Sequence, residues 1–230
     1  MLTLEDVVLA QGDFRLTADL GLAPGLTAVI GPSGGGKSTL LAAIAGFLQP
    51  ARGTMRWNGV AITDEAPGDR PVTMLFQDNN LFPHLSVAQN VGLALAPRLR
   101  LTVAQSLAVD AVLAEVGLAG LGDRKPRALS GGQQGRAALA RALLADRPVV
   151  LLDEAFAALG PALRREMLTL VRDRLAARGR TVVVVTHDPQ DARDFADRIV
   201  LVADGMAHAP RPTDAIFADP PPALRDYLGT

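Results

Sequence analysis

A glycine-rich segment that ends in lysine and serine is the clearest chemical feature of this sequence. Residues 31–38 read Gly-Pro-Ser-Gly-Gly-Gly-Lys-Ser, which fits the pattern G-x-x-x-x-G-K-[ST]. Glycines let backbone N–H groups turn inward and approach phosphate oxygens closely. A lysine at this position reaches the β- and γ-phosphates of a nucleoside triphosphate, and the hydroxyl that follows it ligates Mg²⁺. The predicted nucleotide-binding residues here are Gly31, Pro32, Ser33, Gly34, Gly35, Gly36, Lys37, Ser38 and Thr39.

The lysine in this segment is unusual for the chain. Among 23 basic residues, Lys37 and Lys125 are the two lysines, and all the others are arginine. The sequence therefore uses arginine wherever a general positive charge suffices. Lysine is found at position 37, where binding of the β- and γ-phosphates requires this residue type.

Two adjacent carboxylates follow a short apolar run. Residues 149–152 read Val-Val-Leu-Leu and lead directly into Asp153 and Glu154. Such a run is typical of a strand buried in a parallel sheet, and ligands bind beyond the carboxyl ends of those strands. Alone, the pair could equally be two solvated acids. With the phosphate loop upstream, we expect Asp153 to hold Mg²⁺, directly or through water, and Glu154 to polarise the attacking water.

The rest of the chain supplies elements that could position these residues. Alternation over residues 14–20 predicts a half-buried strand. Continuous apolar runs predict strands buried on both faces, at residues 26–30, 149–152, 181–185 and 199–202. Helices are predicted from residue 38, from Thr102 with capping-box spacing to Gln105, and from Pro161.

This alternation of strands and helices predicts an α/β fold with a parallel sheet. The stretch from about 86 to 146 is mostly helical and shows no obvious strand. We interpret it as a helical subdomain inserted into the α/β core.

A third motif lies inside that helical stretch. Residues 129–133 read Leu-Ser-Gly-Gly-Gln, and Ser130 and Gln133 have the spacing of a capping box. A capping box does not explain two glycines in the first turn, where each costs about 1 kcal/mol relative to alanine. Close approach of the backbone to an anion does explain them. With this pentapeptide, the chain resembles the ATP-binding subunits of ABC transporters over nearly its whole length, with all three motifs in the family order.

The resemblance implies one ATP-binding domain over residues 1–230. Its fold would be a P-loop NTPase core with a parallel sheet, an N-terminal antiparallel β subdomain and the inserted helical subdomain. ATP and Mg²⁺ are the implied ligands. Gln77 is similar to the glutamine that touches Mg²⁺ in the family, and His187 to the histidine that contacts the γ-phosphate. The implied catalytic residues are Glu154, His187 and Gln77, and the implied metal contacts are Ser38, Gln77 and Asp153.

The resemblance also implies partners. In the family two chains pack head-to-tail around two ATP molecules, so Ser130 and Gly132 would act on the nucleotide of the partner chain. The implied signature contacts are Ser130, Gly131, Gly132 and Gln133. Closure of this homodimer would drive transmembrane permease subunits, supplied by a periplasmic substrate-binding protein. The chain would then lie peripherally on the cytoplasmic face of the inner membrane.

Residues 74–82 and 161–171 are similar to the ATP-binding subunits of thiamine importers. Import of a small nutrient, thiamine and its phosphates, is therefore the expected function. Residues 79–82 could instead reflect the membrane partner, because this segment meets that partner in the family. The alternatives are another small solute such as iron or a polyamine, and a poorly hydrolysing nucleotide-dependent regulator. A small-molecule kinase would leave the signature unexplained.

Composition excludes several other classes. Net charge is −1, so no bulk positive field draws the chain to nucleic acid or to an anionic membrane. ABC-type ATPases that act on DNA or ribosomes usually carry coiled-coil insertions, paired cassettes or basic stretches, and none is visible. There is no cysteine, which excludes disulfides, thiolate metal sites and a cysteine nucleophile. The apolar runs are too short to span a bilayer.

Several positions depart from the family pattern. Gly160 replaces an aspartate that contacts the partner's phosphate loop, which puts coupling between the two ATP sites in doubt. Ala155 stands where proline is usual. The pair Gln134-Gly135 replaces Arg-Gln, and a glycine inside a helix costs about 1 kcal/mol. Gln11 stands where an aromatic residue often stacks on adenine, and the adenine platform stays unassigned. Phe14 is nearby but fits the alternating strand as a core residue.

Overall fold

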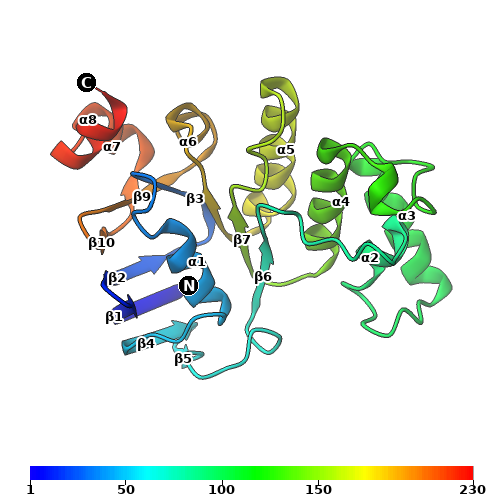
Figure 1. Ribbon diagram of the computed structural model, residues 1–230, viewed down its shortest axis with the longest axis horizontal. Helices are drawn as coiled ribbons and strands as arrows, with labels where there is room; N and C mark the ends of the chain where they lie inside the picture. Colours follow the sequence, from blue (N-terminus) through cyan, green and yellow to red (C-terminus); the bar gives the residue numbers. More distant parts are fainter. Residues whose placement is uncertain (230) are drawn as a thin grey trace.

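A computed structural model describes residues 1–229. Its centre is a parallel sheet with strand order β9-β3-β8-β7-β6 (Figure 1). The strands are β3 (Gly25–Ile30), β6 (Val72–Leu75), β7 (Val149–Asp153), β8 (Thr181–Val185) and β9 (Arg198–Ala203). The apolar runs over 26–30, 149–152, 181–185 and 199–202 all form strands, which confirms the parallel α/β prediction. Strand β6 was not predicted, because Thr73 interrupts its four residues and they form no continuous apolar run.

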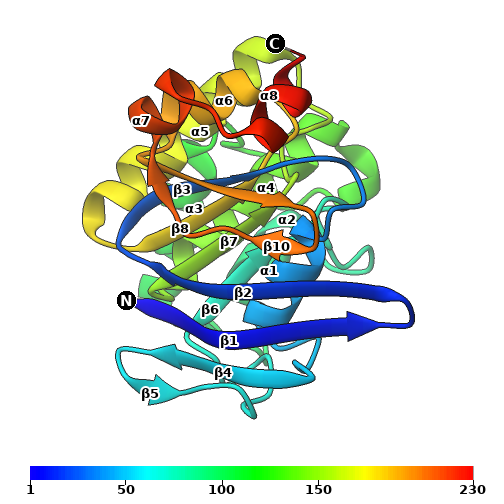
Figure 2. The same cartoon turned by 90° about the vertical axis from the view of Figure 1, so that its left-hand side faces the viewer.

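An antiparallel sheet forms the N-terminal side of the molecule, with order β5-β4-β1-β2 (Figure 2). Its strands are β1 (Leu2–Gln11), β2 (Phe14–Leu22), β4 (Arg52–Trp57) and β5 (Val60–Ala61). The short strand β10 (Met206–Ala207) pairs with both β2 and β9, so it joins the two sheets. Strand β11 (Arg211–Pro212) pairs with β9.

Helix α1 (Lys37–Ala45) packs into the apolar core that the two sheets share. Its carboxyl end is held by Arg70, whose side chain is fully buried. The guanidinium Nη1 donates to the carbonyls of Ala43 and Ile44 at 2.7 and 3.0 Å. These bonds satisfy carbonyl groups that a helix end leaves without partners. Helix α1 is therefore fixed at the end remote from the phosphate loop.

A helical segment lies beside the sheet, at the right of Figure 1. Its helices are α2 (Val87–Gly92), α3 (Val103–Glu115), the 3₁₀ turn η1 (Pro126–Ala128) and α4 (Gly131–Leu144). Helices α2, α3 and α4 each begin with a capping box, including the predicted one at Thr102 and Gln105. Val91, Val112 and Ala137 belong to a separate apolar core inside this segment. Residues 86–146 contain no strand, as predicted.

The remaining helices build a second apolar core with the parallel sheet. They are α5 (Pro161–Arg174), the 3₁₀ turn η2 (Ala176–Arg178), α6 (Pro189–Phe195), α7 (Thr213–Ala218) and α8 (Pro222–Leu228). Leu168 and Val171 of α5 pack in the same core as Leu152 and Val184 of the sheet. Among residues 1–229, no helix is long and apolar enough to cross a membrane.

Candidate nucleotide site

The glycine-rich loop connects β3 to α1, and its backbone requires glycine at two positions. Gly31 has φ +142°, and a Cβ built on it would lie 2.0 Å from the carbonyl oxygen of Val202. Gly36 is the N-cap of α1 with φ +101°, and its Cβ would lie 2.6 Å from the ring of Phe14. Any larger residue at either position would push the loop away from the sheet. The loop is thus held close against β9 and the start of β2.

Lys37 is wrapped by the loop that precedes it. Its Nζ donates to the carbonyls of Gly31 and Pro32, both at 2.8 Å, and the residue is 7% exposed. Burial lowers the pKa of Lys37, and the nearby carboxylates of Glu154 and Asp153 oppose this shift. The ammonium is therefore placed inside the loop, beside the two acids at the end of β7.

The predicted metal ligands Ser38 and Asp153 lie together. The hydroxyl of Ser38 donates to Oδ1 of Asp153 at 2.9 Å. Burial raises the pKa of Asp153; Glu154 adds to the shift, while the Ser38 hydrogen bond and Lys37 oppose it. A hydroxyl and a carboxylate are oxygen ligands of the kind Mg²⁺ prefers, so this pair fits that ion.

The third predicted metal contact, Gln77, is not part of this pair. It lies exposed just beyond the end of β6. Within residues 1–229 its side chain makes no hydrogen bond to Ser38 or Asp153. The structure therefore joins two of the three predicted metal contacts.

Glu154 and His187 lie across two neighbouring strand ends. Because Asp153 of β7 pairs with Val185 of β8, the residues that follow these strands emerge side by side. Nδ1 of His187 is 3.6 Å from Oε2 of Glu154. Glu154 has φ +47°, a left-handed conformation that is strained for a residue with a side chain. The structure thus brings these two predicted catalytic residues together.

The loop, Glu154 and β2 line one cleft. Its lining includes Gln11, Phe14, Gly34, Lys37, Ser38 and Glu154. Phe14 was interpreted as core, and it does pack against the core between the sheets. It also faces the cleft and touches Gly36, which that interpretation missed. The signal available in the sequence was an aromatic residue three positions after Gln11, the expected place of the adenine-stacking residue.

The signature residues begin helix α4, away from this cleft. Ser130 Oγ accepts from the backbone N–H of Gln133 at 3.3 Å, and Gln133 Oε1 accepts from the N–H of Ser130 at 3.0 Å. A Cβ on Gly131 would meet open space, whereas one on Gly132 would lie 3.2 Å from Leu159 and Leu163. Of the described residues lining the cleft, none comes from 130–133. Within one chain, the signature and the phosphate loop are therefore not brought together.

The structure shows the surroundings of two positions, Gly135 and Gly160, that depart from the family pattern. Gly135 of helix α4 lies against the turn after β6, and a Cβ on it would lie 3.4 Å from Oδ1 of Asn79, an ordinary contact. Arg141 of the same helix donates to the carbonyls of Asn80 at 2.9 Å and Asn79 at 3.3 Å. Gly160 is the N-cap of α5 and makes no side-chain cap bond, yet the helix begins at Pro161 as predicted.

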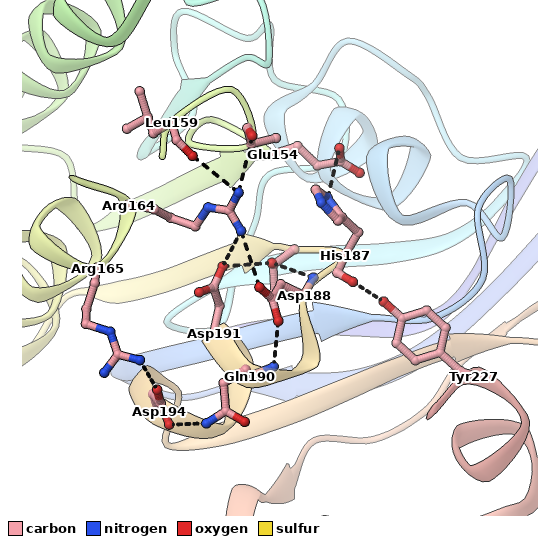
Figure 3. Close-up of polar contacts among 12 residues, drawn as sticks. Glu154, Leu159, Arg164, Arg165, His187, Asp188, Gln190, Asp191, Asp194 and Tyr227 are labelled. Atoms are coloured by element: carbon pink, nitrogen blue, oxygen red, sulfur yellow. Dashed lines mark hydrogen bonds and ion pairs between the residues drawn. The ribbon is translucent and has the colours of Figure 1, made fainter. Parts of the chain in front are cut away.

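Two further residues next to the site were not singled out from sequence. Arg164 contacts the loops after both β7 and β8, and the hydroxyl of Tyr227 donates to the carbonyl of His187 at 2.8 Å (Figure 3). Neither residue sits in a motif. One arginine among many and the single tyrosine near the C-terminal end of the sequence carry no pattern that points to these contacts.

Comparison with known proteins decides the family. Residues 18–157 match the family described as ABC transporter, which is more than half of the chain. The chain belongs to the ABC transporter family. It is an ATP-binding and ATP-hydrolysing member, and its fold is that of an ABC cassette. The fold and the enzyme class expected from the sequence are thereby confirmed.

Relatives extend over the full chain. A protein of Cereibacter sphaeroides described as thiamine import ATP-binding protein ThiQ is 61% identical over 230 residues, covering 100% of both chains. A protein of Ruegeria sp. with the same description is 54% identical over 231 residues, again covering 100% of both. A solved ATP-binding cassette, described as a dimeric post-hydrolysis state bound to ADP and Pi, is 30% identical. It has a TM-score of 0.81 and covers 93% of this ABC chain and 99% of its own.

Proposed function

We propose that this ABC protein is the ATP-hydrolysing subunit of a thiamine importer. The observation that carries the proposal is 61% identity, over the whole of both chains, to a relative described as a thiamine import ATP-binding protein. A nucleotide site assembled from Lys37, Ser38, Asp153 and Glu154 agrees with this role. Residues 1–230 would form one ATP-binding domain, in which about 86–146 is the inserted helical subdomain.

The site residues would act on ATP in a simple order. Lys37 and the loop N–H groups bind the β- and γ-phosphates. Glu154 accepts a hydrogen bond from the attacking water and takes its proton while the water oxygen bonds to the γ-phosphorus. The bond from that phosphorus to the bridging oxygen of ADP breaks, and the proton then passes to the phosphate product. The products are ADP and inorganic phosphate. His187 contacts the γ-phosphate from the neighbouring strand end.

Mg²⁺ would be held by Ser38 and Asp153, whose oxygens already lie within hydrogen-bond distance. Gln77 would complete the set from the segment after β6. When bound there, Mg²⁺ neutralises charge on the phosphate oxygens.

The exposed start of helix α4 supports action in trans. Ser130 and Gly131 are exposed and lie outside the cleft of their own chain. In a head-to-tail homodimer, the signature residues of one chain would close on the nucleotide of the other. A solved relative is described as dimeric, which agrees with this arrangement. The dimer would work on transmembrane permease subunits at the cytoplasmic face of the inner membrane, and a periplasmic binding protein would deliver the solute.

Uptake of labelled thiamine tests the substrate. Cells of the source organism that lack this chain would receive either the parent chain or Glu154→Gln, with expression checked by immunoblot. We expect uptake only with the parent chain. Normal uptake without the chain would refute thiamine as its substrate and redirect the search to other small nutrients. Equal uptake with both versions would instead refute the role given to Glu154.

A further inference from the structure

The guanidinium of Arg164 joins two loops that emerge from neighbouring strands (Figure 3). On one side, Nη2 donates to the carbonyls of Ala157 at 3.3 Å and Leu159 at 3.4 Å, in the loop that begins with Glu154. On the other side, Nη1 lies 3.3 Å from Oδ2 of Asp188 and 3.6 Å from Oδ2 of Asp191. Asp188 comes directly after His187, and Asp191 lies in helix α6, which follows.

The groups that Arg164 contacts are themselves held in place. Oδ1 of Asp188 accepts from the backbone N–H of Gln190 at 2.9 Å, which caps helix α6. Oδ2 of Asp191 accepts from the hydroxyl of Thr186 at 3.4 Å. The side chain of Arg164 is 17% exposed and that of Asp191 is 18% exposed. A rigid, permanently charged fork in a sheltered site is suited to fixing two loops relative to each other.

This arrangement bears on the pair Glu154 and His187. Their side chains meet at 3.6 Å, but that contact is the only described one between them. The left-handed backbone at Glu154 is strained, and such a conformation persists only when the surrounding structure holds it. The loop that follows Glu154 is held by Arg164 at Ala157 and Leu159.

We propose that Arg164 is a positioning residue for ATP hydrolysis, which fixes the loop after Glu154 to the loop after His187. It does not touch the nucleotide; it acts through the placement of the other two residues. The inference rests on the roles proposed above for Glu154 and His187.

The residue that follows Arg164 provides a matched control for its substitution. Arg165 is on the same helix and also pairs with α6, because its Nη2 is 2.9 Å from Oδ2 of Asp194. Its side chain is 65% exposed, and its contact with Asp194 lies away from both loops. Removing Arg165 therefore removes an α5–α6 ion pair without releasing either loop.

The experiment compares Arg164→Ala, Arg164→Lys, Arg165→Ala and Glu154→Gln in the full chain. The measurements are kcat and KM for ATP, affinity for a fluorescent ATP analogue, and Tm. We expect Arg164→Ala to lower kcat about tenfold to a hundredfold, with KM and analogue affinity within about threefold, because misplaced groups lose turnover before binding. Arg164→Lys should recover part of kcat, because an ammonium can pair with one acid but cannot span both loops. Arg165→Ala should keep kcat within about twofold.

Two results would overturn the inference. One is parental kcat in a folded Arg164→Ala variant, and the other is an equal loss of kcat in Arg165→Ala. If Arg164→Ala does not fold, Arg164→Lys decides: a lower kcat at unchanged KM and Tm supports the inference, and an unchanged kcat refutes it. Parental turnover in Glu154→Gln would refute the proposed role of Glu154. Normal turnover in Arg164→Ala beside an inactive Glu154→Gln would refute the inference about Arg164 alone.

Discussion

The hydroxyl of Ser38 donates a hydrogen bond to the carboxylate of Asp153, 115 positions later in the sequence, at 2.9 Å. Ser38 lies in the first turn of α1 and Asp153 is the last residue of β7. Helix α1 begins and strand β7 ends at the same edge of the parallel sheet, which is where ligands bind in such folds. The acid is therefore partly buried, and this has a measurable consequence.

Asp153→Asn is expected to stabilise the nucleotide-free chain at neutral pH. Burial raises the pKa of Asp153 above its usual value near 3.8. The unfolded chain then ionises first, so the folded chain loses stability as pH rises from that value through the folded-state pKa. Asparagine does not titrate and can still accept the Ser38 hydrogen bond. The difference in Tm between variant and parent, measured in EDTA from about pH 4 to 8, should therefore grow with pH. A difference that stays constant or shrinks would contradict this.

Glu154→Gln is expected to lower turnover by about a thousandfold while ATP binding persists. The amide keeps the shape of the side chain but cannot act as the base for the attacking water. Steady-state ATPase assays and titration with a fluorescent ATP analogue measure the two effects separately. Glu166→Gln, an exposed change on α5, is the control and should keep parental turnover. Equal hydrolysis by Glu154→Gln and parent would rule out this role.

Gly31→Ala should be far more damaging than Gly34→Ala. The new Cβ at position 31 would lie 2.0 Å from the carbonyl oxygen of Val202, so the loop must move; we expect a loss of about 3 kcal/mol or more. Gly34 has φ +77°, but a Cβ built on it would have no atom within 4 Å. The Gly34→Ala change should therefore lower the free energy of unfolding by only about 1–2 kcal/mol, through backbone strain. Urea unfolding of both variants tests the order. Similar losses would show that the contact with Val202 is not what demands glycine.

Gly135→Ala should stabilise the chain. The position is inside helix α4, where alanine is favoured over glycine by about 1 kcal/mol. The added Cβ would lie 3.4 Å from Oδ1 of Asn79, an ordinary contact. Thermal unfolding should show a rise of about 2–4 °C for each kcal/mol gained. Gly132→Ala, whose Cβ would lie 3.2 Å from Leu159 and Leu163, should gain less. A loss of stability in Gly135→Ala would mean that the turn at Asn79 needs the space.

Local chemistry and periodicity explain which parts of the fold were predictable. The strand over Thr181–Val185 is buried along its length, so it reads as a continuous apolar run. The capping box at Thr102 involves residues three apart, which the sequence displays directly. Strand β6 has four residues, of which the two ends are buried and the two middle residues are half-buried, so its residues show neither an alternation nor a continuous apolar run.

The residues of the site also differ in whether the sequence alone could reveal them. Lys37, Ser38 and Glu154 are visible because their chemistry requires particular residue types next to a buried strand. Arg164 is not visible, because its contacts are to backbone carbonyls and to acids 24 or more positions away. Nothing in the residues around an arginine shows which distant loops its side chain will meet.

At position 154, the left-handed backbone favours one kind of residue, whereas ATP turnover requires another. At φ +47°, glycine or asparagine would fit with less strain than glutamate. A laboratory evolution experiment that rewarded only heat resistance would therefore drive position 154 toward those residues. Only a requirement for ATP turnover during the selection would keep the carboxylate. The residue found at position 154 afterwards would therefore show whether the population had been selected for stability alone or also for activity.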